Sequence, residues 1–259
     1  MAAILLDVDG VFHVSGHPIA GGGDAVRRLR EAGHRLRFVS NNTTRSRAAL
    51  TAELRALGVD LEESELQTAP AAAAHALAGK RVLVLTMAAI VEDLEGIELV
   101  GHDAEAVLLG GADETDEPGR VFSYMNLARA FAELSHGADL YCLHRNKWWQ
   151  TERGPLLDAG MFVAGLEYAA GVEATVLGKP STAYFEAALQ AIDADAALTW
   201  MVGDDVESDV IGAQRHGMKT VLVRTGKFRP DQVEDTGVFP DGIVSSIATL
   251  PDWLEEFAA

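Results

Sequence analysis

Short apolar runs rich in β-branched residues alternate with helical patterns along the whole chain. The predicted strands cover residues 4–6, 36–39, 81–85, 106–109, 140–143, 175–177, 199–202 and 220–223. Strands that alternate with helices are typical of βαβ units, whose crossover helices lie on both faces of a parallel sheet. We therefore expect an α/β fold with a Rossmann-like, doubly wound parallel sheet.

Helical patterns fill most of the intervals between these strands. One covers about residues 25–30 and stops at Gly33, and another runs from about Ser46 to Leu57 before Gly58. Glycine at these positions suits a helix C-terminus. Further helices are expected over residues 71–78, 122–134 and 206–216, and from Ser181 onwards.

Candidate catalytic and ligand-binding residues lie towards the two ends of the chain, with a long and less informative stretch between them. The simplest organisation is one discontinuous core that is interrupted by an inserted α/β domain. We place the core at residues 1–78 and 177–259, and the insert at residues 79–176.

Acidic residues far outnumber basic ones. The chain has 39 Asp and Glu against 21 Lys and Arg, which gives a formal net charge of −18. Nucleic acid and anionic membranes would be repelled by such a surface, so we expect neither as a partner. The apolar run from Ala2 to Leu6 is too short for a signal peptide, and no run approaches the length of a membrane span. We expect a cytoplasmic protein, with the single cysteine, Cys142, buried as a small apolar residue.

The first acidic motif is Asp7-Val8-Asp9-Gly10, directly after the first predicted strand. Residues two apart in a strand point the same way, and open α/β sheets bind ligands beyond the carboxyl ends of their strands. Two such close acids repel each other unless a cation lies between them, and Mg²⁺ prefers oxygen ligands. The alternative is an ordinary turn with solvated acids.

A second acidic motif, Gly203-Asp204-Asp205, follows the predicted strand 199–202 and opens the helix that carries Asp209. Asp204 could complete a metal site, and Asp209 could hold a metal-bound water or position a lysine. The alternative is simple N-capping, since Asp is common at helix starts.

Two further motifs suit a phosphate group. Ser40-Asn41-Asn42 follows a strand with a hydroxyl, an amide and backbone N–H groups, and Lys179 follows another strand with a cation. Alone, Ser40-Asn41-Asn42 would be interpreted as an ordinary turn, and Lys179 as a solvated lysine, as most lysines are. All four motifs, however, follow predicted strands, so a parallel sheet would bring them to one edge. Together they predict a site for phosphoryl transfer.

In order and spacing these motifs resemble those of the haloacid dehalogenase superfamily of phosphatases. Asp7-Val8-Asp9-Gly10 matches the first motif of that family, Ser40 with Asn41 the second, Lys179 the third, and Gly203-Asp204 with Asp209 the fourth. The large insert between the second and third motifs resembles class IIA of the superfamily. That resemblance covers essentially the whole chain, and it implies that the insert is a C2-type α/β cap.

Longer runs are similar to one group within the superfamily, the phospholysine phosphohistidine inorganic pyrophosphate phosphatases and their paralogues. These runs cover residues 122–126, 165–168, 178–181 and 224–230. The resemblance departs at one position, because those relatives carry serine where this chain has Asp9. Their substrate preference therefore need not apply to this chain.

The resemblance implies a mechanism through an aspartyl-phosphate. Asp7 is the expected nucleophile, and Asp9 first protonates the leaving oxygen and then activates water. Mg²⁺ is expected on the Asp7 carboxylate, the Asp9 carbonyl oxygen and Asp204, with Asp209 next to this set. The expected phosphate ligands are Ser40, the backbone N–H of Asn41, and Lys179, which also counts as catalytic.

Residues 11–18 are expected to form a flap over the site, with His13 facing solvent or the inserted domain. The alternative for His13 is contact with the substrate. Substrate specificity is expected to come from the inserted domain, where the segment 144–150 mixes cations with aromatic residues. Lys147, Trp148 and Trp149 are the candidates. The alternative for each tryptophan is packing against the domain's own sheet.

We therefore expect a Mg²⁺-dependent phosphatase that acts on small phosphorylated metabolites. One alternative is a phosphoamidase or pyrophosphatase of the phospholysine phosphohistidine type. Another is a non-catalytic binding scaffold, which would need none of Asp7, Asp9, Lys179 and Asp204. A homodimer that forms through the inserted domain is a further expectation.

Overall fold

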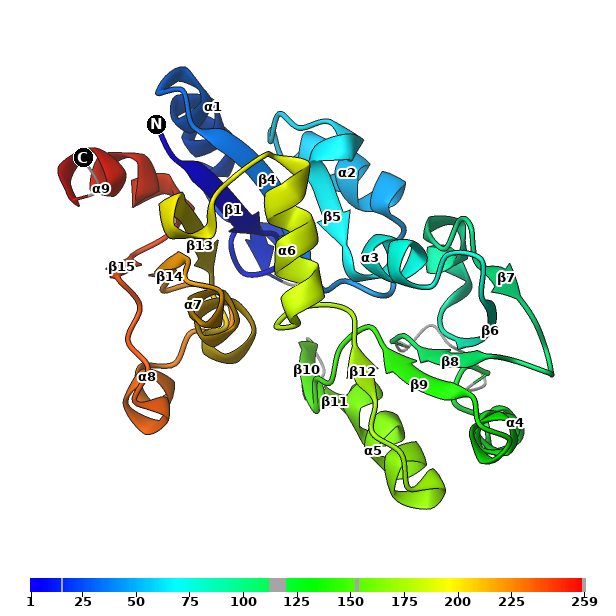
Figure 1. Cartoon of the computed structure of the whole chain (residues 1–259). Coiled ribbons are helices and arrows are strands. Elements are labelled where there is room, and N and C mark those ends of the chain that lie inside the picture. The colour runs from blue at the N-terminus through cyan, green and yellow to red at the C-terminus, as the bar shows by residue number, and fades with distance from the viewer. Residues whose placement is uncertain (15, 112–119, 152–153, 258–259) are drawn as a thin grey trace. The chain divides into compact units, whose positions relative to one another are not determined.

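The computed structural model describes residues 1–14, 16–111, 120–151 and 154–257 (Figure 1). The chain folds into two compact units. The core unit comprises residues 1–40, 48–67 and 179–259, and the inserted unit comprises residues 41–47 and 68–178. The domain limits expected after residues 78 and 176 stay a prediction.

A six-stranded sheet forms the centre of the core unit, in the strand order β15-β14-β13-β1-β4-β5 (Figure 1). The strands are β1 (Ala3–Asp7), β4 (Arg35–Ser40), β5 (Leu66–Thr68), β13 (Thr199–Gly203), β14 (Lys219–Val223) and β15 (Gly242–Val244). The pairings from β15 across to β4 are parallel. β1 is central, with Leu6 opposite Val202 of β13 and Asp7 opposite Val39 of β4. Three strands therefore deliver their last residues to one edge.

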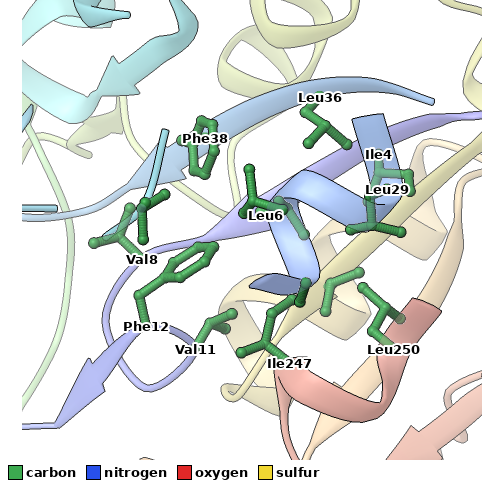
Figure 2. Packing of buried hydrophobic residues seen from close by; sticks show 14 of the residues in the cluster. Ile4, Leu6, Val8, Val11, Phe12, Leu29, Leu36, Phe38, Ile247 and Leu250 are labelled. Atoms are coloured by element: carbon green, nitrogen blue, oxygen red, sulfur yellow. The ribbon is translucent and has the colours of Figure 1, made fainter. Parts of the chain in front are cut away.

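Helices cover both faces of this sheet. They are α1 (Gly22–Glu31), α2 (Arg47–Ala56), α6 (Thr182–Ala191), α7 (Gly212–Arg215), α8 (Pro230–Thr236) and α9 (Leu250–Phe257). On one face, Ile4 and Leu6 of β1 pack against Leu29 of α1 and Leu250 of α9 (Figure 2). On the other, Leu222 of β14 packs against Val206 and Val210. The core unit is thus the doubly wound Rossmann-like fold that the strand–helix alternation predicted.

The packing around β1 explains why its end is so well fixed. All five residues of β1 are buried. A fully buried Leu or Ile side chain contributes about 1.5–3 kcal/mol. Because successive side chains of β1 point to opposite faces, both layers of helices hold this strand in register.

The inserted unit has its own parallel sheet, in the order β12-β9-β8-β6-β7. Its strands are β6 (Arg81–Leu85), β7 (Glu98–Leu99), β8 (Ala106–Leu109), β9 (Asp139–Cys142) and β12 (Thr175–Val176). One face packs against α4 (Tyr124–Ser135) and α5 (Ala159–Ala170), and the other against α3 (Ala69–Ala76). The insert is therefore an α/β domain, as expected.

Two hairpins complete the described structure. β2 (His13–Val14) pairs with β3 (His17–Pro18), and β10 (Trp148–Thr151) pairs with β11 (Gly154–Leu157). Cys142 is buried, and this burial raises the pKa of its thiol to about 12. Among the parts of the chain that the structure describes, no helix has the length and apolar character needed to cross a bilayer.

One helix differs from its predicted form. The segment expected as a helix over residues 206–216 begins as a π-helical turn, Val206–Ile211, and becomes α-helical only at Gly212. The Asp205 carbonyl accepts from the backbone N–H groups of both Asp209 and Val210. Such wide turns are frequent at functional sites. Here the turn carries Asp209, which is fully buried.

Candidate active site

Three buried carboxylates meet at the carboxyl edge of the core sheet. Asp7 is the last residue of β1, Asp204 directly follows the neighbouring β13, and Asp209 lies in the π-helical turn. One oxygen atom from each lies within 4.8 Å of the others. The side chain of Asp7 remains only 5% exposed. Parallel strands have therefore brought together acids that are about 200 residues apart in the sequence.

Lys179 lies between two of these acids. Its Nζ is 2.7 Å from Asp7 Oδ1 and 2.7 Å from Asp209 Oδ1. Burial alone would lower the pKa of Lys179, but the negative charges of Asp209 and Asp7 outweigh that effect and raise it well above its ordinary value. The ammonium is therefore charged, and it holds Asp7 in one orientation.

The cluster carries more negative than positive charge. Burial, followed by the charge of Asp209, raises the pKa of Asp7 well above its ordinary value. The same two causes raise the pKa of Asp204 to about 7. Raised pKa values mean that these acids hold protons more readily when no cation is bound. If a metal displaces those protons, three ionised carboxylates beside one ammonium leave two negative charges, which matches the charge of a divalent cation. A buried set of carboxylate oxygens is the donor set that Mg²⁺ prefers, so the residues fit such an ion.

Asp9 lies in different surroundings from Asp7. Its side chain is 51% exposed, and its Oδ2 is 3.5 Å from the Ser40 hydroxyl. The turn between β1 and β2 fixes its backbone, because Gly10 adopts a φ of +81° and its N–H donates to the His13 carbonyl. One acid of the motif is therefore buried against a lysine, and the other can reach a bound ligand.

Tyr184 of α6 is a site residue that no sequence motif indicated. Its hydroxyl accepts from the Ser40 N–H at 3.0 Å and lies 3.1 Å from the Ser40 carbonyl and 2.8 Å from the Gln67 carbonyl. It thus ties the ends of β4 and β5 together. The available signal was weak, since Tyr184 is one aromatic residue in a helix that follows Lys179 in the sequence.

The segment Thr225-Gly226-Lys227 closes over Asp204. The Lys227 N–H donates to Asp204 Oδ2 at 2.6 Å, and the Thr225 hydroxyl donates to the Gly10 carbonyl. A Cβ atom at Gly10 or Gly226 would overlap the Asp204 carboxylate. Only the similarity over residues 224–230 pointed to this segment, without a role for it.

His13 is only 3% exposed, so the expectation that it faces solvent is wrong. The turn that ends at His13 directs its ring towards Asp9, with Nε2 3.7 Å from Asp9 Oδ1. Sequence alone could not distinguish this from an exposed flap residue, because histidine is intermediate between the residue types that are usually buried and those that are usually exposed.

The remaining predicted residues belong to the inserted unit. Asn41 directly follows Ser40 and begins the segment 41–47 of that unit. Lys147 is exposed, Trp148 is 51% exposed, and the side chain of Trp149 lies outside the described residues. The segment 144–150 begins at His144, which is buried and lies 3.2 Å from the Thr43 hydroxyl. Roles for Asn41, Lys147 and the tryptophans stay predictions.

Known proteins are similar to this chain in sequence and in fold. A family model for haloacid dehalogenase-like hydrolases matches residues 4–100, and a HAD-hydrolase-like model matches residues 176–250. The phospholysine phosphohistidine inorganic pyrophosphate phosphatase of Homo sapiens is 38% identical over 98% of this chain and 94% of its own length. These matches confirm the resemblance seen in the sequence.

Solved structures of phosphatases are similar to this chain in fold. The p-nitrophenyl phosphatase of Archaeoglobus fulgidus has a TM-score of 0.89 and 30% identity, over 97% of this chain and 98% of that one. The glycerol phosphate phosphatase of Mycobacterium tuberculosis, solved in complex with magnesium, has a TM-score of 0.82 and 28% identity, over 96% of this chain and 76% of that one. The chain therefore belongs to the haloacid dehalogenase superfamily, as a phosphatase whose Rossmann-like core carries an inserted α/β cap.

Proposed function

We propose that this phosphatase is Mg²⁺-dependent and cleaves small phosphorylated metabolites through an aspartyl-phosphate on Asp7. One observation carries the proposal: a buried carboxylate at the end of the central strand, with Lys179 Nζ at 2.7 Å and two more acids beside it. A scaffold would gain little from such a cluster, because burying ionised groups is costly unless they serve binding or catalysis.

The metal would be held by Asp7, Asp204 and the main-chain carbonyl of Asp9, with Asp209 beside them. When bound, Mg²⁺ would supply positive charge that neutralises the phosphoryl group. The cluster's excess of two negative charges supports this assignment, as does the magnesium complex of the similar glycerol phosphate phosphatase. Asp209 also holds Lys179, so its loss would disturb the lysine as well as the ion.

The side chains support a two-step reaction. The Asp7 carboxylate attacks phosphorus, and the leaving oxygen takes a proton from Asp9 as its bond to phosphorus breaks. Asp9 then removes a proton from water, the resulting oxygen bonds to phosphorus, and the bond to Asp7 breaks to release phosphate. Ser40, the Asn41 N–H and Lys179 bind the phosphoryl oxygens throughout, since this chemistry depends mainly on positioning and charge neutralisation.

The reaction is tested by trapping its intermediate. The protein is mixed with p-nitrophenyl phosphate and Mg²⁺, quenched in acid during the first turnover, and digested for mass spectrometry. We expect a phosphoryl adduct on Asp7. An adduct on any other residue, or a burst of nitrophenolate with no adduct, contradicts the proposal.

A second candidate function follows from the human relative, whose name includes phospholysine, phosphohistidine and pyrophosphate. The identity of 38% over nearly the whole chain favours considering P–N and P–O–P bonds. A panel of sugar phosphates, nucleotides, phospholysine, phosphohistidine and pyrophosphate, compared by kcat/KM, separates the two candidates. Asp9 supports the phosphomonoesters, because an alcohol leaving group gains most from a full carboxylic acid.

The role of Asp9 as an acid predicts an effect that depends on the leaving group. Replacing Asp9 by Asn or Ser should slow single-turnover cleavage of alkyl phosphates by roughly 10²–10⁴-fold, the usual scale of general acid–base catalysis. Cleavage of p-nitrophenyl phosphate should suffer much less, because nitrophenolate departs without a proton. The aspartyl-phosphate formed from this substrate should hydrolyse more slowly than in the unchanged protein, because the attacking water has lost its base. We therefore expect a burst of nitrophenolate followed by a low steady rate.

The two substrates serve as controls for each other, since a distorted site would slow both. Equal losses on the alkyl and aryl substrates would mean that Asp9 is not the acid. In that case its role would reduce to positioning the metal.

A further inference from the structure

The ring of His13 is a buried polar group. Its backbone is held in the turn after β1, where the His13 carbonyl accepts from Gly10 N–H at 2.8 Å. Within the described part of the chain, neither ring nitrogen has a hydrogen-bonding partner. Buried polar groups are nearly always paired, and an exception in a native site calls for an explanation.

The side chain of Asp9 lies close to this ring. His13 Nε2 is 3.7 Å from Asp9 Oδ1, beyond the usual limit of about 3.2 Å for an N–H···O bond. His13 is confined by its burial, whereas Asp9 is half exposed and can rotate. A movement of less than about 1 Å by the carboxylate would complete the bond.

The two oxygens of Asp9 therefore have different neighbours. Oδ1 faces His13, and Oδ2 lies 3.5 Å from the hydroxyl of Ser40, a proposed phosphate ligand. Of the two oxygens, Oδ2 is the one beside this proposed phosphate ligand. A freely rotating carboxyl would present either oxygen there, and only one of the two can carry the proton.

We infer that His13 is a positioning residue for Asp9, an inference that rests on the proposed function. The imidazole donates its Nε2–H to Asp9 Oδ1 and keeps Oδ2 as the oxygen that exchanges a proton with the leaving group and with water. His13 itself gives up no proton. Because it is buried, it acts through Asp9 and does not touch the substrate.

Three variants test this role by the position of the donor they carry. In His13→Gln the amide nitrogen can occupy the place of Nε2, in His13→Asn it occupies the place of Nδ1, and in His13→Leu no donor remains. We expect Leu and Asn to slow single-turnover cleavage of alkyl phosphates by up to about 10²-fold, the scale of a misplaced catalytic group. Gln should restore most of the rate. KM for the alkyl phosphate and nitrophenolate release from p-nitrophenyl phosphate should change little.

A double-variant cycle adds a second measurement. In the Asp9→Asn background, His13→Leu should cause no further loss on alkyl phosphates, because the acid that His13 positions is already absent. Equal losses on alkyl and aryl substrates, no loss with Leu, or a Gln variant as slow as Leu would overturn the inference. If Leu does not fold, Gln against Asn still decides, because both are polar and differ only in where the donor lies.

The failure of this inference can be told apart from failure of the proposed function. If Asp9→Asn shows no preference for the leaving group, the assignment of Asp9 fails, and the role of His13 fails with it. If Asp9→Asn shows the preference and His13→Leu does not, the inference alone is wrong.

Discussion

Replacing Asp7 by Asn is expected to abolish phosphatase turnover and to leave the protein folded. The amide has nearly the shape of the carboxylate, but it cannot attack phosphorus. Lys179 would keep its hydrogen bond to Asp209 at 2.7 Å, so one carboxylate would still balance the charge of the buried ammonium. The negative charges of Asp209 and Asp204 repel the Asp7 carboxylate and help raise its pKa. The neutral amide removes this repulsion, which favours a folded variant. Phosphate release and thermal unfolding of the same sample provide the measurement.

The matched control is Asp205→Asn, the same chemical change at an acid next to Asp204. Asp205 accepts from the N–H groups of Glu207 and Ser208 at the start of the π-helical turn, and Asn caps a helix about as well as Asp. This control should keep most of its activity. Substantial turnover by Asp7→Asn, in a sample shown to be free of deamidation, would rule out the covalent mechanism.

Removal of metal ions is expected to have an equally large effect. Activity should disappear in EDTA and return with Mg²⁺, because Lys179 alone cannot balance three ionised carboxylates together with a bound phosphoryl group. Ca²⁺ should restore it poorly, since its larger and looser coordination sphere would misplace the nucleophile. Unchanged turnover in a preparation shown by elemental analysis to be metal-free would contradict the proposed site.

The response to Mg²⁺ should also depend on pH. In the metal-free protein, burial raises the pKa of Asp204 to about 7, so a proton competes with the ion for this carboxylate. A ligand must lose its proton to bind a metal, which makes binding stronger as the pH rises through that value. The Mg²⁺ concentration that gives half-maximal activity should therefore decrease as the pH rises from about 6 to about 8. Thermal stabilisation by Mg²⁺, measured on the same samples, gives a readout that does not depend on turnover.

Local pattern was enough to predict the elements that hold the site. The strands that end at Asp7, Ser40 and Gly203 are short and largely apolar, and a polar residue lies at the end of each or directly after it. The order of these segments implied a parallel sheet, and a parallel sheet places their ends together. Edge strands such as β15 were not predicted, because three residues carry too little periodicity to separate a strand from a loop.

Contacts made far along the chain could not be predicted in this way. The hydroxyl of Tyr184 meets Ser40, 144 residues away, and Lys227 meets Asp204 through a backbone N–H, which any residue but proline could supply. The burial of His13 depends on the path of a turn, which the identity of the residue does not determine. Local sequence thus indicated which side chains can do chemistry, and the tertiary fold determined how they are held.

The narrow space around Asp204 has a consequence for protein engineering. Gly10 and Gly226 approach its carboxylate from two distant parts of the chain, and neither position has room for a Cβ atom. Both glycines also have positive φ angles, of 81° and 60°, so a side chain at either would be strained as well as crowded. Libraries built to alter the substrate range should keep both codons fixed and place their diversity elsewhere. A single alanine at either site would cost activity by displacing the Asp204 carboxylate, although the glycine it replaces does no chemistry itself.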